Sequence, residues 1–108
     1  MNKMLEAVRE IHETRSFKAN GGEDPLFRMN LIMEEVGEIC SCLTKDQGNI
    51  AEEHADLLIL FLGNCVALDI DIEAEFWNKV KKLNSYRTIS TGKYMRLSSK
   101  PEEGEDHV

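Results

Sequence analysis

The stretch that decides the fold is residues 53–68, which read EHADLLILFLGNCVAL. Its first turn carries two acids, Glu53 and Asp56, and almost everything after them is apolar. The apolar run is too short to cross a bilayer, which requires about 20 apolar residues. It therefore predicts a buried helix. Because such a helix is apolar on nearly every side, we expect its own neighbouring helices and a second subunit to cover it.

Helix signals on either side of this stretch predict a protein with four helices. The last three helices each start after a residue that can cap free amide groups: Asp24, Asn49 and Asp71. Along the first and fourth helices apolar residues recur at spacings of three and four, as in amphipathic helices. The predicted ranges are about 3–18, 25–43 and 50–68, and the fourth helix begins at about 72 and includes Leu83. We expect an all-α, four-helix bundle-like protomer.

The length of 108 residues leaves room for one domain. We assign residues 1–87 to the helical domain. Residues 88–108 contain turn residues, no helical stripe and a polar, mostly acidic end, so we expect an extended, partly disordered tail.

The net charge and the cysteines limit which partners the protein can bind and in which cellular compartment we expect it. A formal net charge of -7 disfavours binding to a nucleic acid polymer or to an anionic membrane. The N-terminus lacks the apolar run of a signal peptide. The odd set of three cysteines, Cys40, Cys42 and Cys65, favours reduced thiols over disulfides or a zinc site. We therefore expect a cytoplasmic protein.

Two acidic turns carry the candidate chemistry. Residues 34–38 read EEVGE, a spacing that projects Glu35 and Glu38 from one helical face. Glu53 and Asp56 form a second pair of acids, also three residues apart, on the next helix. The short connection between the two helices predicts a hairpin in which both acidic turns meet. Converging carboxylates suit Mg²⁺, with Mn²⁺ as the alternative. The competing interpretation is a pair of solvated acidic faces, the usual state of exposed charge.

A basic segment follows the acids, with no acidic residue between Lys79 and Arg96. A triphosphate bound to a metal needs such cations for its remaining oxygens. For Lys79 and Lys82 the alternative is simple solvation of a helix end, where positive charge is favourable. The basic residues are Lys79, Lys81, Lys82, Arg87, Lys93 and Arg96.

These features resemble the MazG-like nucleotide pyrophosphohydrolases of the all-α NTP pyrophosphatase superfamily, whose hallmark is Glu-Glu-x-x-Glu followed by Glu-x-x-Asp. Residues 34–38 and 53–56 supply both halves, and the resemblance covers about Leu5 to Arg87. It implies a helical dimer or dimer of dimers that hydrolyses nucleoside or deoxynucleoside triphosphates to the monophosphate and pyrophosphate. The metal ligands that it implies are Glu35, Glu38, Glu53 and Asp56.

The resemblance also implies a Lys, an Asn and an Arg that contact phosphate late in the fourth helix. Asn84 and Arg87 match the last two. The usual spacing places the Lys at Val80, so we assign this role to Lys81, one turn before Asn84. For orienting or deprotonating the attacking water we select Glu34, beside the ligands but not required as one. A supporting or solvated acid is the alternative for Glu34.

Other residues are expected to be structural. We predict a surface or packing role for His54, and a bond from Asn64 to another helix. We expect the aromatic side chains to lie in the core and not to stack on the base of a nucleotide; they are Trp77, Phe17 and Phe27. Two rival functions remain. One is a non-catalytic helical dimerisation module or nucleotide sensor, and the other is a scaffold whose acidic face binds a basic partner.

Overall fold

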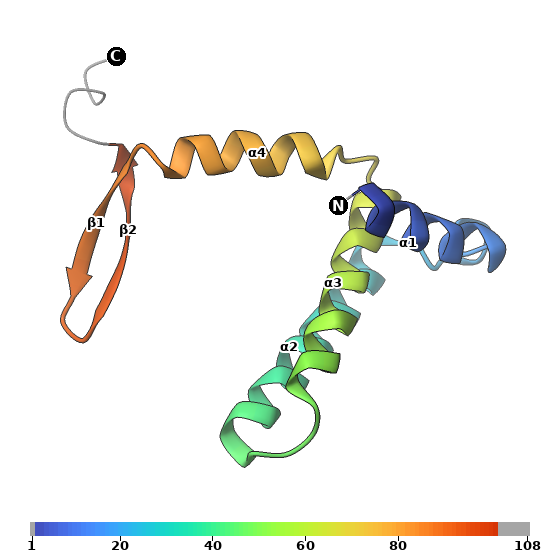
Figure 1. Cartoon of the computed structure of the whole chain (residues 1–108). Coiled ribbons are helices and arrows are strands. Elements are labelled where there is room, and N and C mark those ends of the chain that lie inside the picture. Colours follow the sequence, from blue (N-terminus) through green and yellow to red (C-terminus); the bar gives the residue numbers. More distant parts are fainter. Residues whose placement is uncertain (1, 102–108) are drawn as a thin grey trace. The chain divides into compact units, whose positions relative to one another are not determined.

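The computed structural model describes residues 2–101, which belong to two compact units, one ending at Ile70 and the next beginning at Asp71 (Figure 1). The first unit contains three helices and a short 3-10 turn. The second contains one helix and a two-stranded hairpin. The elements are α1 (Asn2–Thr14), η1 (Lys18–Asn20), α2 (Pro25–Lys45), α3 (Ile50–Ala67), α4 (Ile72–Leu83), β1 (Tyr86–Thr91) and β2 (Tyr94–Pro101).

Side-chain caps start three of the four helices at the predicted residues. Asp24 accepts a hydrogen bond from the Phe27 amide at 2.9 Å, with Pro25 at the first helical position. Asn49 caps α3 at 3.1 Å and Asp71 caps α4 at 3.2 Å. Each cap satisfies an amide that has no partner inside its helix. The four predicted helices are confirmed, although α1 ends at Thr14 and not near Lys18.

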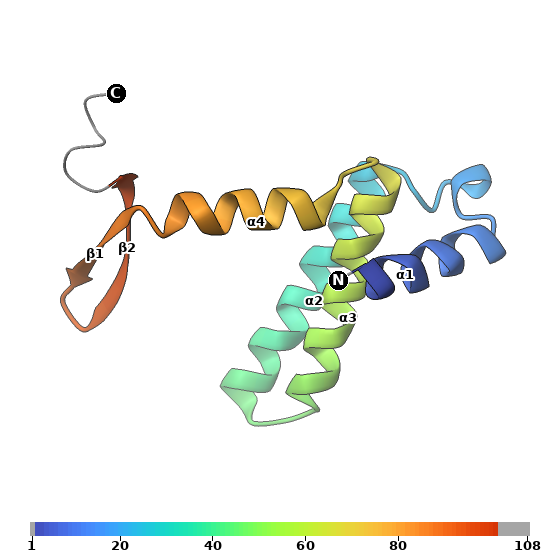
Figure 2. The same ribbon diagram turned by 45° about the horizontal axis from the view of Figure 1, so that its top comes forward.

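Helices α2 and α3 form an antiparallel hairpin, and α3 also packs against α1 (Figures 1 and 2). The connection between α2 and α3 is short and passes through Gly48, whose φ of +82° favours glycine. The core of this unit includes Val8, Leu62 and Cys65, each 3% exposed or less. Burial raises the pKa of the Cys65 thiol.

The hairpin corrects the prediction of an all-α protein, because residues 86–101 form antiparallel strands. A two-residue loop joins them, with Gly92 at a φ of +77° in its first position. The protein is therefore mostly helical. The tail was expected to be disordered from Ser98, yet residues 98–101 belong to β2, and residues 102–108 lie outside the described part.

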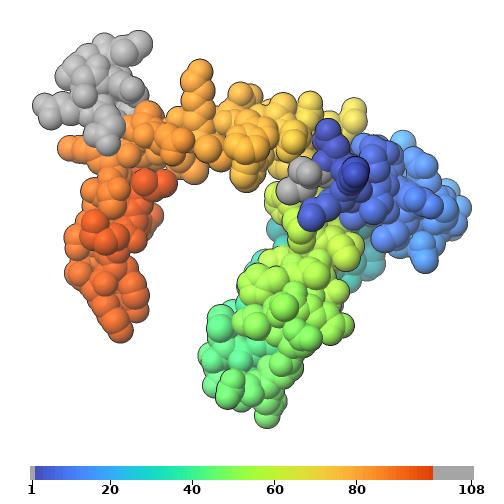
Figure 3. Space-filling view, viewed as in Figure 1, coloured from blue at the N-terminus to red at the C-terminus, as the bar shows by residue number. Residues whose placement is uncertain are grey.

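Burial differs from expectation at several apolar residues. Trp77 is 58% exposed and Phe27 is 49% exposed, so neither lies in the core as predicted, whereas Phe17 is half-buried against the His12 ring. On the viewed face of the space-filling surface, α3 is open to solvent (Figure 3). Its Ile59 and Phe61 are 45% and 46% exposed. Within residues 2–101, no helix combines the length and hydropathy that a membrane span requires.

Candidate metal centre

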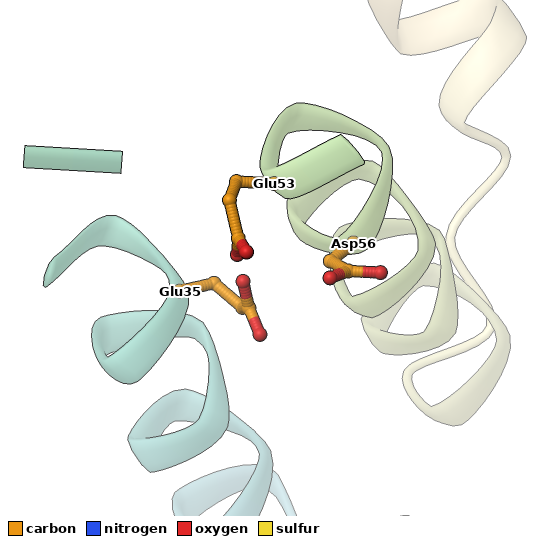
Figure 4. A group of neighbouring side chains, drawn as sticks. All are labelled: Glu35, Glu53 and Asp56. Atoms are coloured by element: carbon orange, nitrogen blue, oxygen red, sulfur yellow. The ribbon is translucent and has the colours of Figure 1, made fainter. Parts of the chain in front are cut away.

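The hairpin of α2 and α3 brings three of the four predicted ligands together. One carboxylate oxygen from each of Glu35, Glu53 and Asp56 lies within 4.8 Å of the others. Figure 4 shows the Glu35 and Glu53 carboxyl groups pointing toward each other from facing helices, with Asp56 beside them. Glu38 is exposed and lies outside this trio, so its role as a ligand stays a prediction.

One oxygen of the trio has no hydrogen-bond partner although it is enclosed. This atom is Oε2 of Glu35. Buried polar atoms without a partner are rare in folded proteins, because their desolvation is not repaid. This enclosed oxygen is therefore available as a ligand for a cation bound among the three carboxylates.

The acids also raise the pKa of Glu35 to about 7. The largest cause is a side-chain hydrogen bond with Glu53, which two carboxyl groups can share only when one holds a proton. Desolvation comes next. The negative charges of Glu53, Asp56 and Glu38 then add to the shift, since each favours the neutral form of Glu35.

The donor set fits a hard divalent cation. All donors are carboxylate oxygens from Glu35, Glu53 and Asp56, which is the chemistry that Mg²⁺ and Mn²⁺ prefer, and three side chains leave positions for water and phosphate. A divalent cation would also satisfy the enclosed Glu35 oxygen and replace the shared proton. The role of these residues as metal ligands follows from this fit as a proposal.

A hollow of about 340 Å³ opens beside the trio. Glu34 lines it together with Glu35 and Asp56, so the predicted water-orienting residue faces the same space as two of the acids. A larger hollow of about 570 Å³ lies against α1 and the end of α3. It lacks the acidic trio, and we assign the chemistry to the smaller one.

The predicted phosphate-contacting residues all lie in the second unit and are exposed. Lys81 lies in the last turn of α4, and Asn84 is the C-cap of that helix. Arg87 was expected on the helix but lies on β1, because α4 ends at Leu83. The three residues therefore remain candidates for phosphate binding on sequence grounds.

Sequence reasoning missed a buried polar cluster that involves α1, α2 and α3. Arg28 of α2 is 3% exposed and His12 of α1 is 4% exposed. The Nδ1 atom of His12 lies 2.8 Å from Oε2 of Glu23, and the Arg28 guanidinium bonds to α3. The one available cue was Asn64, polar within the apolar run. Its predicted bond to another helix is confirmed by a 2.7 Å hydrogen bond from Nε of Arg28. His54 is exposed, also as predicted.

Comparison with family models confirms the resemblance found in the sequence: the chain belongs to the all-α NTP pyrophosphatase (MazG-like) superfamily of hydrolases, and the α2–α3 hairpin with its acidic trio agrees with that assignment. Within that superfamily, the model of the family described as phosphoribosyl-ATP pyrophosphohydrolase matches residues 1–84. The chain belongs to this family and is a pyrophosphohydrolase, an enzyme that acts on phosphoanhydride bonds. No curated protein and no solved structure gives a significant match. The match ends before Arg87 and the hairpin.

Proposed function

We propose that the protein hydrolyses phosphoribosyl-ATP between its α and β phosphates, releasing phosphoribosyl-AMP and pyrophosphate. The observation that carries this proposal is the convergence of Glu35, Glu53 and Asp56 in a chain of this family. The sequence alone indicates a nucleoside or deoxynucleoside triphosphate without defining its base or sugar. The family description favours phosphoribosyl-ATP over ordinary deoxynucleoside triphosphates.

The trio, with Glu38 completing the set, would hold Mg²⁺, and Mn²⁺ would be the usual substitute. When bound, the cation supplies charge neutralisation and orientation for the triphosphate oxygens. The chain itself contributes the pairing of α2 with α3, which fixes three ligands before substrate arrives. Such preorganisation lowers the entropic cost of positioning the scissile bond.

Glu34 would orient or deprotonate the attacking water. It lines the hollow beside Glu35 and Asp56, so its carboxylate borders the space in which the attacking water would lie. Lys81, Asn84 and Arg87 would supply charge and hydrogen bonds for the phosphate oxygens that the cation does not neutralise. Pyrophosphate leaves as an anion, and these side chains stabilise the charge that develops on it.

We also propose a second copy of the chain as partner, in a dimer or a dimer of dimers. The support is the apolar surface of α2 and α3, where Met33, Ile59 and Phe61 are each 45% exposed or more. Large apolar side chains that are exposed to this extent on a small protein favour a partner that covers them.

Pyrophosphate release from phosphoribosyl-ATP tests the function. We expect release with Mg²⁺, little release with a chelator, and slower release from a panel of ordinary nucleoside and deoxynucleoside triphosphates. Equal rates across the panel would show a general triphosphate pyrophosphohydrolase. A complete absence of release from every nucleotide, with nucleotide binding retained, would favour the non-catalytic sensor.

A further inference from the structure

We propose that Arg28 is a positioning residue for the acidic trio, because it fixes the register of α2 against α3. The proposal rests on the metal site of the proposed function. Arg28 touches none of the three acids in the hydrogen bonds that the structure gives for it. It acts instead on the helices that carry them.

Three hydrogen bonds hold the Arg28 guanidinium at 3% exposure. Nη2 donates to the Leu60 carbonyl at 2.9 Å, and Nε donates to Oδ1 of Asn64 at 2.7 Å, so two bonds cross from α2 to α3. Nη1 donates to the Gly22 carbonyl at 3.0 Å, which ties the same group to the segment before α2. A planar guanidinium with three fixed acceptors cannot slide along α3 without losing bonds in a buried position.

The charge of Arg28 is balanced inside the same cluster. Burial lowers the pKa of the Arg28 guanidinium, and the negative charge of Glu23 opposes that effect. Glu23 is in turn held by His12 on α1, with 2.8 Å between Nδ1 and Oε2. This arrangement links α1 to the clamp formed by Arg28, Leu60 and Asn64, and it keeps the guanidinium in one place.

The spacing along the two helices connects this clamp to the acids. Glu35 follows Arg28 by seven residues on α2, and Glu53 precedes Leu60 by seven residues on α3. Seven residues are close to two helical turns, or about 10 Å, and return to nearly the same face. Because the helices are antiparallel, holding Arg28 opposite Leu60 places Glu35 opposite Glu53 (Figure 4). A slip of one residue would shift an acid by about 1.5 Å and turn it by about 100°.

Gly63 makes room for the clamp. A Cβ atom at this position would collide with Nη2 of Arg28 and would lie 2.8 Å from Nε2 of His12. The absence of a side chain at Gly63 therefore lets the guanidinium reach the backbone of α3. Gly63→Ala is an informative variant, because it displaces the guanidinium while keeping every charge, and alanine is the better helix former.

Direct Mn²⁺ binding, measured by calorimetry without nucleotide, tests the proposal. All variants are compared at a temperature where circular dichroism shows them fully folded. We expect Arg28→Lys and Gly63→Ala to bind Mn²⁺ roughly tenfold more weakly than the original protein, within the range that remote substitutions produce. Val8→Ala is the matched control, because it removes a buried contact on α1 and lowers stability without touching the clamp.

The outcomes separate this inference from the proposed function. If the original protein does not bind Mn²⁺, the proposed metal site is wrong, and so is the role of the clamp in positioning it. Normal Mn²⁺ binding by Arg28→Lys and Gly63→Ala, with melting temperatures lowered as in Val8→Ala, shows that Arg28 only stabilises the fold and overturns the inference. If Arg28→Lys does not fold, Asn64→Ala, which removes one of the two bonds to α3, carries the same test.

Discussion

The carboxyl groups of Glu35 on α2 and Glu53 on α3 point toward each other, and the proximity of Glu53 raises the pKa of Glu35 to about 7, so Glu35 keeps its proton up to near-neutral pH. An arrangement of this kind costs stability once both acids ionise, and it is retained where the charges serve another purpose. A divalent cation is the natural replacement for the proton. Because a proton and a cation compete for the same carboxylates, the stability of the protein should depend on both pH and metal concentration.

The metal-free protein should lose stability as the pH rises from about 4.5 to about 7. Glu35 releases its proton near 4.5 when unfolded and near 7 when folded, so between these values the folded state binds more protons. The stabilisation is therefore complete below about 4.5 and lost above about 7. Calorimetric melting temperatures in chelator across this range check the direction.

Two comparisons isolate the Glu35 contribution. Glu35→Gln should flatten the fall in melting temperature, whereas Glu10→Gln, on the exposed face of α1, should leave it unchanged. Adding Mg²⁺ should raise the melting temperature more at pH 8 than at pH 5, because the cation competes with the proton. An equal increase in melting temperature at pH 8 and pH 5 would show that Glu35 does not bind the metal.

Glu53→Gln should reduce metal-dependent turnover by about 100-fold or more and leave the fold intact or slightly stabilised. The change deletes one charged ligand, which weakens cation binding. It also removes a carboxylate whose negative charge opposes ionisation of Glu35 in the metal-free state. Mg²⁺ should therefore raise the melting temperature of the original protein more than that of the variant. Equal shifts would identify Glu53 as an ordinary surface acid.

The helices and the acidic trio could be predicted because their causes are local. Asp24, Asn49 and Asp71 satisfy amides within three residues of themselves, and a four-residue connection leaves α2 and α3 few alternatives to an antiparallel pair. Once that pair is expected, the spacing within each helix places Glu35 and Glu53 on facing sides.

What could not be predicted depends on distant partners. Arg28 reads as a surface residue in the sequence, and its acceptors on α3 lie 32 and 36 positions away. The hairpin was missed because residues 86–91 are too polar to show a buried strand, although Ile89 and Thr91 favour extended structure. The 58% exposure of Trp77 could not be predicted from the pattern of a single helix, because burial depends on the elements that pack against that helix.

Phe61→Glu should reduce the mass of the particle in light scattering to that of a monomer. Phe61 is 46% exposed on α3, and a charge placed there would be desolvated in an interface. Lys3→Gln on α1, which makes the net charge more negative by the same one unit, is the control. A stable monomer for the original protein at micromolar concentration would rule out the second copy.

Arg87→Ala should raise KM for the nucleotide by about tenfold and leave the shift in melting temperature caused by Mg²⁺ unchanged. Losing a hydrogen bond to a charged phosphate has a cost of that order. Lys93→Ala, in the turn of the same hairpin, serves as the control for a nonspecific loss of positive charge. Equal increases for both variants would indicate general electrostatic attraction rather than a contact made by Arg87.

Glu34→Gln should lower kcat by about 10²- to 10⁴-fold, the range for loss of a general base, while Mn²⁺ affinity stays close to that of the original protein. The separation is expected because Glu34 lines the hollow beside Glu35 and Asp56 but is not among the three clustered acids. Full turnover by Glu34→Gln would show that Glu34 does not take part in the reaction. A loss of Mn²⁺ affinity parallel to the loss of kcat would show that Glu34 is a metal ligand.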